Sequence, residues 1–127
     1  MKFDIKDDFA VCNIDENVVG ISKKMKKNKR LNHVIILDNK KPVGIVSVRD
    51  IVERVVAEEK DIKKTKVSDI MTSPIVAIKE NQDLKEIADM MIKNSFLSLP
   101  VVNKTDEFLG VVSIYDVLGK LKENQKK

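Results

Sequence analysis

The chain has 127 residues, of which 43% are apolar, 35% charged and 4% aromatic, with no Trp. This size predicts one compact body with a well-solvated surface, and so few aromatic side chains exclude a broad surface for stacking nucleic-acid bases. The net charge of +4 is too small to hold the chain on DNA or a membrane without local clustering. A single Cys and a single His exclude an internal disulfide and a Cys/His metal site. No apolar run approaches the ~20 residues of a membrane helix or resembles a signal peptide, so the cytoplasm is the expected compartment.

The first elements expected along the chain are a short strand and an amphipathic helix. Residues 9–12 form a short apolar run that is typical of a buried strand. Val18, Ile21 and Met25 follow at helical spacing and predict one apolar face. The basic run 23–30 (KKMKKNKR) would close the last turn of this helix, where cations are favourable. We interpret it as a solvated helix end, with a nucleic-acid contact as the alternative.

Two strands joined by a polar turn come next, followed by a second helix. Residues 34–37 and 43–48 are rich in β-branched side chains and flank the turn DNKK, so they predict a hairpin. The second helix is expected to begin near Arg49, with an apolar face made by Ile51, Val52, Val55 and Val56. The polar stretch 61–69 (DIKKTKVSD) is typical of a linker.

The second half of the chain predicts the same order of elements. Residues 75–78 predict a strand, and Asp83 with Glu86 is a candidate capping pair for the helix that follows. Five apolar residues give that helix one face: Leu84, Ile87, Ala88, Met91 and Ile92. Strands 99–102 and 109–114 would flank the turn NKTDE, and a last helix would begin near Tyr115 with the face Val117, Leu118 and Leu121.

The order β-α-β-β-α occurs twice because the chain is an internal repeat. An offset of 66 positions aligns its halves without a gap, so that PVGIVSVRDIV falls on FLGVVSIYDVL. Gly, Ser and Asp match at the same spacing inside two apolar runs, which chance would rarely produce. We expect a first motif at 1–60, a linker leading into the second motif at 61–74, the second motif at 75–121 and a frayed tail at 122–127. Because ~60 residues bury only a marginal core, the two motifs of this α/β (α+β) fold are expected to pack sheet to sheet about a pseudo-twofold axis.

Each repeat ends a strand with Ser-x-x-Asp and then opens a helix, with Ser47 and Asp50 in the first copy and Ser113 and Asp116 in the second. The simplest interpretation is a capping box with Asp in place of Glu. The same geometry suits a ligand, because a helix N-terminus attracts phosphate and a carboxylate accepts two hydrogen bonds from the neighbouring hydroxyls of ribose. We therefore assign both aspartates to ribose and both serines to phosphate or to the turn, and capping is compatible with binding.

The two copies of G-h-h-S-x-x-D-h-h (h apolar), together with IMTSPIVAI, LKEIADMM and LSLPVVN, resemble a tandem pair of cystathionine-β-synthase (CBS) motifs, known as a Bateman module. The resemblance covers residues 9–121 and is closer in the second copy, since the first has HVII where the second has LPVV. It implies a regulatory module with no required cofactor and no catalysis. The implied ligand is an adenine nucleotide (AMP, ADP or ATP) or an S-adenosyl compound such as S-adenosylmethionine or methylthioadenosine, bound in clefts between the motifs. The implied partners are a second copy, giving a homodimer, and a regulated protein of unknown identity.

The resemblance also implies which residues line the two clefts. In the better-matched cleft, apolar side chains and backbone groups would hold adenine, Asp50 the ribose and Arg49 a phosphate; its residues are Thr72, Ile75, Val76, Ala77, Ser98, Leu99, Pro100, Ser47, Arg49 and Asp50. The second cleft would use Phe9, Ala10, Val11, Asn32, His33, Ser113 and Asp116. Tyr115 stands there at the position of Arg49, so we expect this cleft to take a less charged ligand or to stay empty.

No catalytic signature accompanies these residues. His33 has no evident partner for a nucleophile, and four Gly in the whole chain leave no Walker-type phosphate loop. Cys12 is expected to be a small buried apolar residue. We therefore expect a ligand sensor that is not an enzyme. The alternative is a ligand-independent protein-interaction or nucleic-acid accessory module that uses the basic run 23–30.

Overall fold

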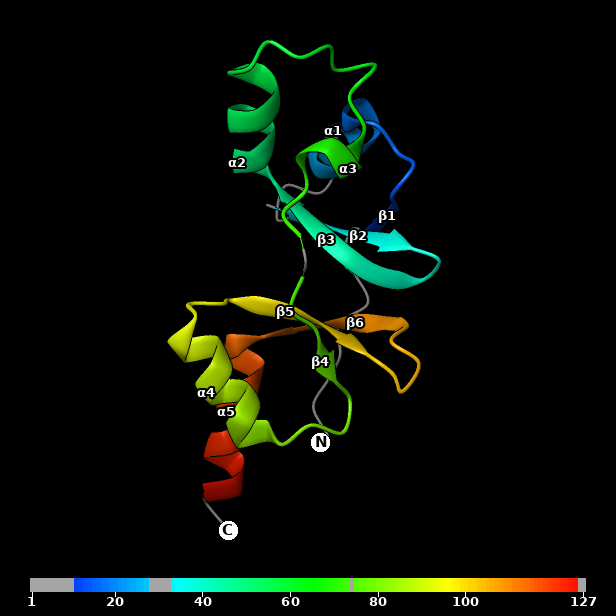
Figure 1. Cartoon of the computed structure of the whole chain (residues 1–127). Coiled ribbons are helices and arrows are strands. Elements are labelled where there is room, and N and C mark those ends of the chain that lie inside the picture. Colours follow the sequence, from blue (N-terminus) through cyan, green and yellow to red (C-terminus); the bar gives the residue numbers. More distant parts are fainter. Residues whose placement is uncertain (1–10, 28–32, 74, 126–127) are drawn as a thin grey trace. The chain divides into compact units, whose positions relative to one another are not determined.

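The computed structural model describes residues 11–27, 33–73 and 75–125, and its contacts divide the chain into two units (Figure 1). The first unit ends at Ile75 and the second continues from Val76. Each unit has one three-stranded sheet, with the order β1-β2-β3 in the first and β4-β5-β6 in the second. The expected mixture of helices and strands and its repetition in the two halves are confirmed.

In the first unit, β1 (Val11–Asn13) runs parallel to β2 (His33–Asp38), which pairs antiparallel with β3 (Lys41–Ser47). The expected hairpin is confirmed, and its turn places Asn39 and Lys40 at φ values of 50° and 68°. This backbone is the one that a two-residue hairpin requires. Positions 9 and 10 of the first expected strand lie outside the described residues.

Two helices of the first unit follow the apolar patterns of the sequence, one fully and one in part. α1 (Val18–Lys27) buries Val18 and Ile21 as expected. α2 (Val48–Ile51) continues into a π-helical turn, η1 (Val52–Val56). Of the face expected there, Val55 is buried, whereas the side chains of Val52 and Val56 are 53% and 64% exposed. The expectation for those two valines was wrong, because four residues within two turns span more of the helix surface than one sheet covers.

The segment expected as a polar linker packs on the first unit. Its end forms the helix α3 (Val67–Ile70), in which Val67 and Ile70 are fully buried. The amide of Val18 donates to the carbonyl of Thr65 at 3.0 Å, and the amide of Val67 donates to the carbonyl of Glu16 at 2.9 Å. These bonds fasten residues 65–70 to the start of α1.

In the second unit, β4 (Ile78–Lys79) runs parallel to β5 (Ser98–Val102), which pairs antiparallel with β6 (Phe108–Ser113). The hairpin was expected at nearly these positions. The expected strand at 75–78 was wrong for residues 75–77, because the pairing begins only at Ile78, opposite Val101. An apolar run predicts burial better than it predicts where a ladder of hydrogen bonds starts.

The helices of the second unit are α4 (Leu84–Lys93) and α5 (Ile114–Gln125). α4 buries Ile87, Ala88 and Met91 as expected, but Ile92 is 60% exposed and does not belong to the buried face. Asp83 occupies the N-cap position of α4 without a side-chain capping bond, so the capping pair with Glu86 was wrong. In α5, Val117 is buried, whereas Leu118 is 42% exposed. α5 continues to Gln125, beyond the expected end of the motif at 121.

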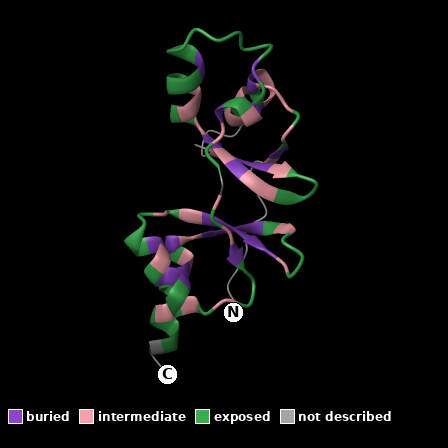
Figure 2. Cartoon of the chain, in the orientation of Figure 1, coloured by how far each residue is buried: buried purple, intermediate pink, exposed green. Residues whose placement is uncertain are grey.

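Each unit has its own apolar core, drawn as the purple segments of Figure 2. Residues 66 positions apart occupy the same places in the two cores: Ile21 and Ile87, Val46 and Val112. The repeat in the sequence is therefore a repeat of packing. In the described ranges, no helix combines the length and hydropathy needed to cross a membrane.

Candidate functional site

The turn at which β3 ends and α2 begins is the capping box expected from Ser47 and Asp50. The amide of Asp50 donates to Ser47 Oγ at 3.0 Å, and the amide of Ser47 donates to Asp50 Oδ2 at 2.8 Å. The other carboxylate oxygen, Oδ1, lies 3.8 Å from Nε of Arg54, and the Asp50 side chain is only 14% exposed. Both carboxylate oxygens thus already face donors of the first unit. Capping is confirmed for this copy.

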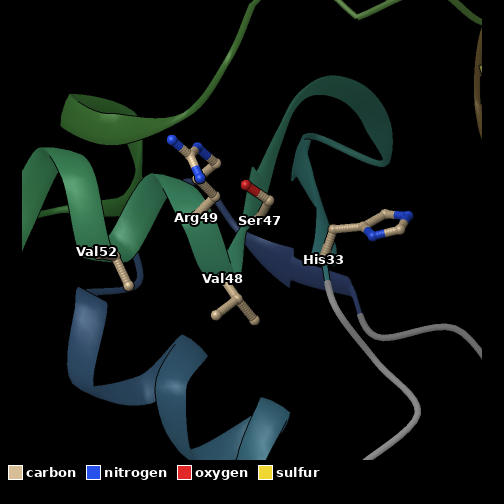
Figure 3. A pocket seen from close by; sticks show the side chains of 5 residues that line it. All are labelled: His33, Ser47, Val48, Arg49 and Val52. Carbon is tan, nitrogen blue, oxygen red and sulfur yellow. The ribbon is translucent and has the colours of Figure 1, made fainter. Parts of the chain in front are cut away.

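Beside this turn lies a pocket of about 380 Å³ lined by His33, Ser47, Val48, Arg49 and Val52 (Figure 3). His33 reaches it from the start of β2, where it is the cross-strand partner of Ser47. The volume falls in the range of about 300–1,000 Å³ that small-molecule sites occupy. We expected His33 and Ser47 in different clefts, whereas the structure brings them to one pocket together with Arg49.

The pocket combines one cation with neutral polar and apolar groups. The side chain of Arg49 is 82% exposed, and its Nη2 lies 2.6 Å from Glu53 Oε1. An exposed ion pair of this kind contributes little stability, so an anionic ligand can compete for the guanidinium. Burial lowers the pKa of His33 below its ordinary value of 6.5, which keeps the imidazole neutral at pH 7. Val48 and Val52 supply an apolar wall on one side of the helix (Figure 3).

The lowered pKa of His33 predicts a pH dependence of stability. Below about pH 6.5 the unfolded chain binds a proton at this position more readily than the folded chain, so stability falls as the pH falls towards the folded-state pKa. In urea titrations, the free energy of unfolding should drop less between about pH 7.5 and pH 5.5 in His33→Leu than in the natural sequence. Leu is the matched replacement because Leu99 stands at the equivalent position of the second repeat. Equal pH slopes in both proteins would contradict the prediction.

The second Ser-x-x-Asp turn has the same backbone bond but a different carboxylate. The amide of Asp116 donates to Ser113 Oγ at 3.1 Å, whereas Asp116 Oδ2 is buried and accepts no hydrogen bond from the described part of the chain. Lys120 occupies the position that Arg54 has in the first copy, and its Nζ pairs with Glu123 at 3.4 Å. The reciprocal half of the capping box is therefore missing in this copy.

The other expected site residues are distributed over both units. Thr72 is exposed and forms an isolated antiparallel bridge with Ile45. Val76 is 41% exposed, and Leu99 packs in the core of the second unit. The remaining described members are Val11, Ile75, Ala77 and Ser98, which are half-buried, and Pro100, which is buried in β5. Phe9, Ala10 and Asn32 lie outside the described residues.

Cys12 and the basic run are engaged with their own unit. Cys12 is 3% exposed, and burial, followed by the charge of Glu16, raises its thiol pKa to about 11, which leaves an unreactive thiol. Lys24 Nζ donates to the carbonyl of Val11 at 2.8 Å and pairs with Glu16 at 3.3 Å. This lysine is thus less available to a nucleic acid, and positions 28–30 of the run lie outside the described residues. No cluster of three or more metal-ligating side chains occurs within residues 11–27, 33–73 and 75–125.

Three residues near the first turn were not predicted as site residues from the sequence. Val48 and Val52 line the pocket, and Arg54 contacts Asp50. A signal for the valines existed, because they lie four residues apart on one helix face and the equivalent positions 114 and 118 are also apolar. No pattern marked Arg54, since the second copy has Lys at that position.

Comparison with known proteins shows to which family the chain belongs. A family model described as the CBS domain matches the chain twice, at residues 3–57 and 67–123. An uncharacterized protein of Methanopyrus kandleri, MK0525, is 29% identical over 103 residues, which make up 81% of this chain and 53% of that protein. The inosine-5'-monophosphate dehydrogenase of Methanocaldococcus jannaschii is 28% identical over 122 residues, or 95% of this chain and 23% of the enzyme. The chain thus spans about half of the first relative and under a quarter of the second.

Solved structures show the same fold. The CBS domain protein PAE2072 of Pyrobaculum aerophilum, complexed with AMP, has a TM-score of 0.73 at 26% identity, over 94% of this chain and 95% of that one. A putative signal-transduction protein with CBS domains from Burkholderia ambifaria has a TM-score of 0.69 at 26% identity, over 92% and 84%. A CBS domain pair/ACT domain protein of Thermotoga maritima shares the fold, with a TM-score of 0.76 at 21% identity, over 94% and 93%. The two matched regions lie on the two repeats, and the chain therefore belongs to the CBS domain family, with two CBS domains in tandem.

Proposed function

We propose that the chain is a regulatory module, not an enzyme, that binds an adenosine-containing ligand at its Ser-x-x-Asp turns and signals through dimer packing or a partner protein. The observation that carries the proposal is the carboxylate of Asp116, whose buried Oδ2 accepts no hydrogen bond from the described residues. A buried carboxylate oxygen without a donor costs free energy. A ligand that brings its own hydroxyl donors would remove that cost.

The ribose of an adenosine-containing ligand has the required chemistry. Its two neighbouring hydroxyls donate hydrogen bonds, and one carboxylate has enough lone pairs to accept both. Ser113, whose hydroxyl lies at the start of α5, offers a further polar contact. The similar protein PAE2072 is known in complex with AMP, which supports AMP as the first member of the class to test, before ADP, ATP, S-adenosylmethionine and methylthioadenosine.

The first unit favours a more strongly charged part of the ligand than the second. Arg49 and His33 line its pocket, while the equivalent positions of the second repeat hold Tyr115, which has no cationic group, and Leu99, which is in the core. A guanidinium forms two parallel hydrogen bonds to phosphate. We therefore assign the phosphate preference to the turn at Ser47, and a weaker charge preference to the turn at Ser113.

Arg49→Gln tests this assignment. The substitution removes the cation but keeps a polar side chain, so AMP affinity should fall about threefold to thirtyfold, while adenosine affinity should stay within about twofold. Isothermal titration calorimetry measures both values. Lys60→Gln, which removes an exposed positive charge from the same unit, is the matched control and should change neither. Equal losses for AMP and adenosine would show that Arg49 does not contact a phosphate.

A thermal-shift panel tests the proposed function itself. A ligand that binds only the folded chain stabilises it by about 2.7 kcal/mol at 100 times its dissociation constant. We expect at least one of AMP, ADP, ATP, S-adenosylmethionine and methylthioadenosine to raise the melting temperature by several degrees. If all five leave it unchanged at millimolar concentration, the chain is not an adenosine sensor. Salt-dependent binding to nucleic acid would then favour the accessory role of residues 23–30.

An apolar groove in the first unit supports a homodimer. It has a volume of about 320 Å³ and is lined by Val18, Val19, Ser22, Lys23, Lys26, Ile51, Val56 and Ile62. Val56 and Ile62 are 64% and 49% exposed. Lys23 and Lys26 line this groove. Glu53 lies within η1, and Glu58 and Glu59 follow η1 in the sequence. In a twofold dimer, η1 of one copy would bring valine and glutamate side chains to the groove of the other.

Val56→Glu should therefore dissociate the dimer. The added carboxylate would be buried in an apolar interface, and analytical ultracentrifugation should show at least a tenfold weaker association. Leu97→Glu, which changes a side chain that is 67% exposed in the second unit, should leave the dimer intact. A natural chain that sediments as a monomer at all micromolar concentrations would contradict the proposed homodimer.

A further inference from the structure

Arg54 joins the carboxylate of Asp50, one helical turn earlier, to backbone carbonyls that lie 16 and 17 residues later in the sequence. Its Nη1 donates to the carbonyl of Ile70 at 3.0 Å and to that of Met71 at 3.2 Å. Its Nε lies 3.8 Å from Asp50 Oδ1. One guanidinium therefore faces the carboxylate of the first Ser-x-x-Asp turn and also holds the backbone at the C-terminal end of α3.

The backbone that Arg54 holds is the segment by which the chain leaves the first unit. The amide of Thr72 donates to the carbonyl of Ile45 at 2.8 Å, and the amide of Ile45 donates to the carbonyl of Thr72 at 3.1 Å. Met71 lies against Gly44, where an added Cβ would come within 2.5 Å of its Sδ. Beyond Ile75 the chain continues into the second unit. Residues 70–72 are thus fastened to β3 and to Arg54 just before the connection between the units.

Up to residue 125, where the described part of the chain ends, the second repeat shows no equivalent of this link. Lys120 stands at the position of Arg54, and its Nζ pairs with Glu123 of the same helix. Lys also lacks the planar fork by which Arg holds several acceptors in fixed directions. The two aspartates differ in the same way as Arg54 and Lys120. Asp50 faces a guanidinium, whereas Oδ2 of Asp116 has no partner in the described residues.

We propose that Arg54 is a positioning residue that couples the carboxylate of Asp50 to the backbone of Ile70 and Met71, so that the state of the first Ser-x-x-Asp turn biases the segment that connects the two units. This regulatory role rests on the proposed function in one respect, namely that a ligand hydroxyl binds Asp50. A hydroxyl that donates to Asp50 competes with Arg54 for the same carboxylate and changes how firmly the guanidinium holds residues 70 and 71. By linkage, a constraint on that segment changes ligand affinity by the same factor.

The coupling can be tested without ligand, through the hydrogen exchange of the Thr72 amide. Arg54→Met keeps the length of the side chain but removes every donor, and Thr72 should exchange about tenfold faster. Asp50→Asn retains an oxygen that can accept from the Ser47 amide, and the exchange should rise by about threefold through Arg54. The double variant should be no faster than Arg54→Met alone, since both changes act through one guanidinium. Lys120→Met is the matched control and should leave Thr72 unchanged. Additive effects of the two variants, or an equal effect of Lys120→Met, would overturn the proposal.

A second arm with AMP separates failure of the coupling from failure of the proposed function. In the natural chain, saturating AMP should change the Thr72 exchange rate by about threefold or more, and this response should disappear in Arg54→Met. If AMP binds and Thr72 responds equally in both proteins, Arg54 does not carry the coupling. If calorimetry shows no binding of AMP or the other four ligands to the natural chain, the proposed function fails, and the ligand-free comparison alone decides the role of Arg54.

Discussion

Asp116→Ala should weaken AMP binding at least about tenfold in the site that Asp116 serves, because two hydrogen bonds to a charged acceptor are lost. The same change should leave the free energy of unfolding within about 0.5 kcal/mol of its original value. Oδ2 of Asp116 accepts no bond from the described residues that would be lost, and the capping bond from the Asp116 amide to Ser113 Oγ needs no carboxylate. Calorimetry with AMP measures the first quantity, and guanidinium unfolding measures the second.

Asp50→Ala is the companion variant at the first turn, and it should lower the free energy of unfolding more than Asp116→Ala does. Its carboxylate accepts from the Ser47 amide and faces Arg54, so its removal should cost about 1 kcal/mol through the lost capping box. Unchanged AMP affinity in a folded Asp116→Ala protein would show that the ribose does not bind at the second turn. If Asp50→Ala then abolished all binding, the ligand would occupy the first turn alone.

The repeated motif could not predict that the two aspartates have different surroundings. Ser-x-x-Asp occurs at the same place in both halves, and the backbone-to-serine bond is present in both. The carboxylates differ because position 54 holds Arg while position 120 holds Lys, and because only Asp50 accepts the reciprocal amide bond. A motif of four residues predicts the turn, whereas the identity of the side chain four residues further along the helix, Arg54 or Lys120, decides whether the carboxylate is already engaged.

The fold was more predictable than the site, since it depends on patterns that both halves repeat. Strands β2, β3, β5 and β6 were expected within one or two residues of their bounds. The pocket was not predicted, because His33 of β2 meets the residues of the turn and helix after β3 only through the register of the two strands, with His33 opposite Ser47. Pairing register depends on the whole hairpin, so the pattern around either residue alone could not group them.

The strongest effect on stability is expected from α4, where two isoleucines of the expected face have different surroundings. Ile87 is fully buried in the core of the second unit, whereas Ile92 is 60% exposed. Ile87→Ala should lower the free energy of unfolding by about 2–5 kcal/mol, because it removes buried methylene groups and leaves a cavity. Ile92→Ala has the same chemistry and helix and should change it by less than about 0.5 kcal/mol. Urea titration of both variants measures the difference. Equal losses would mean that Ile92 is buried in solution. The assignment of Ile92 to the buried helix face, predicted from the sequence, would then be correct.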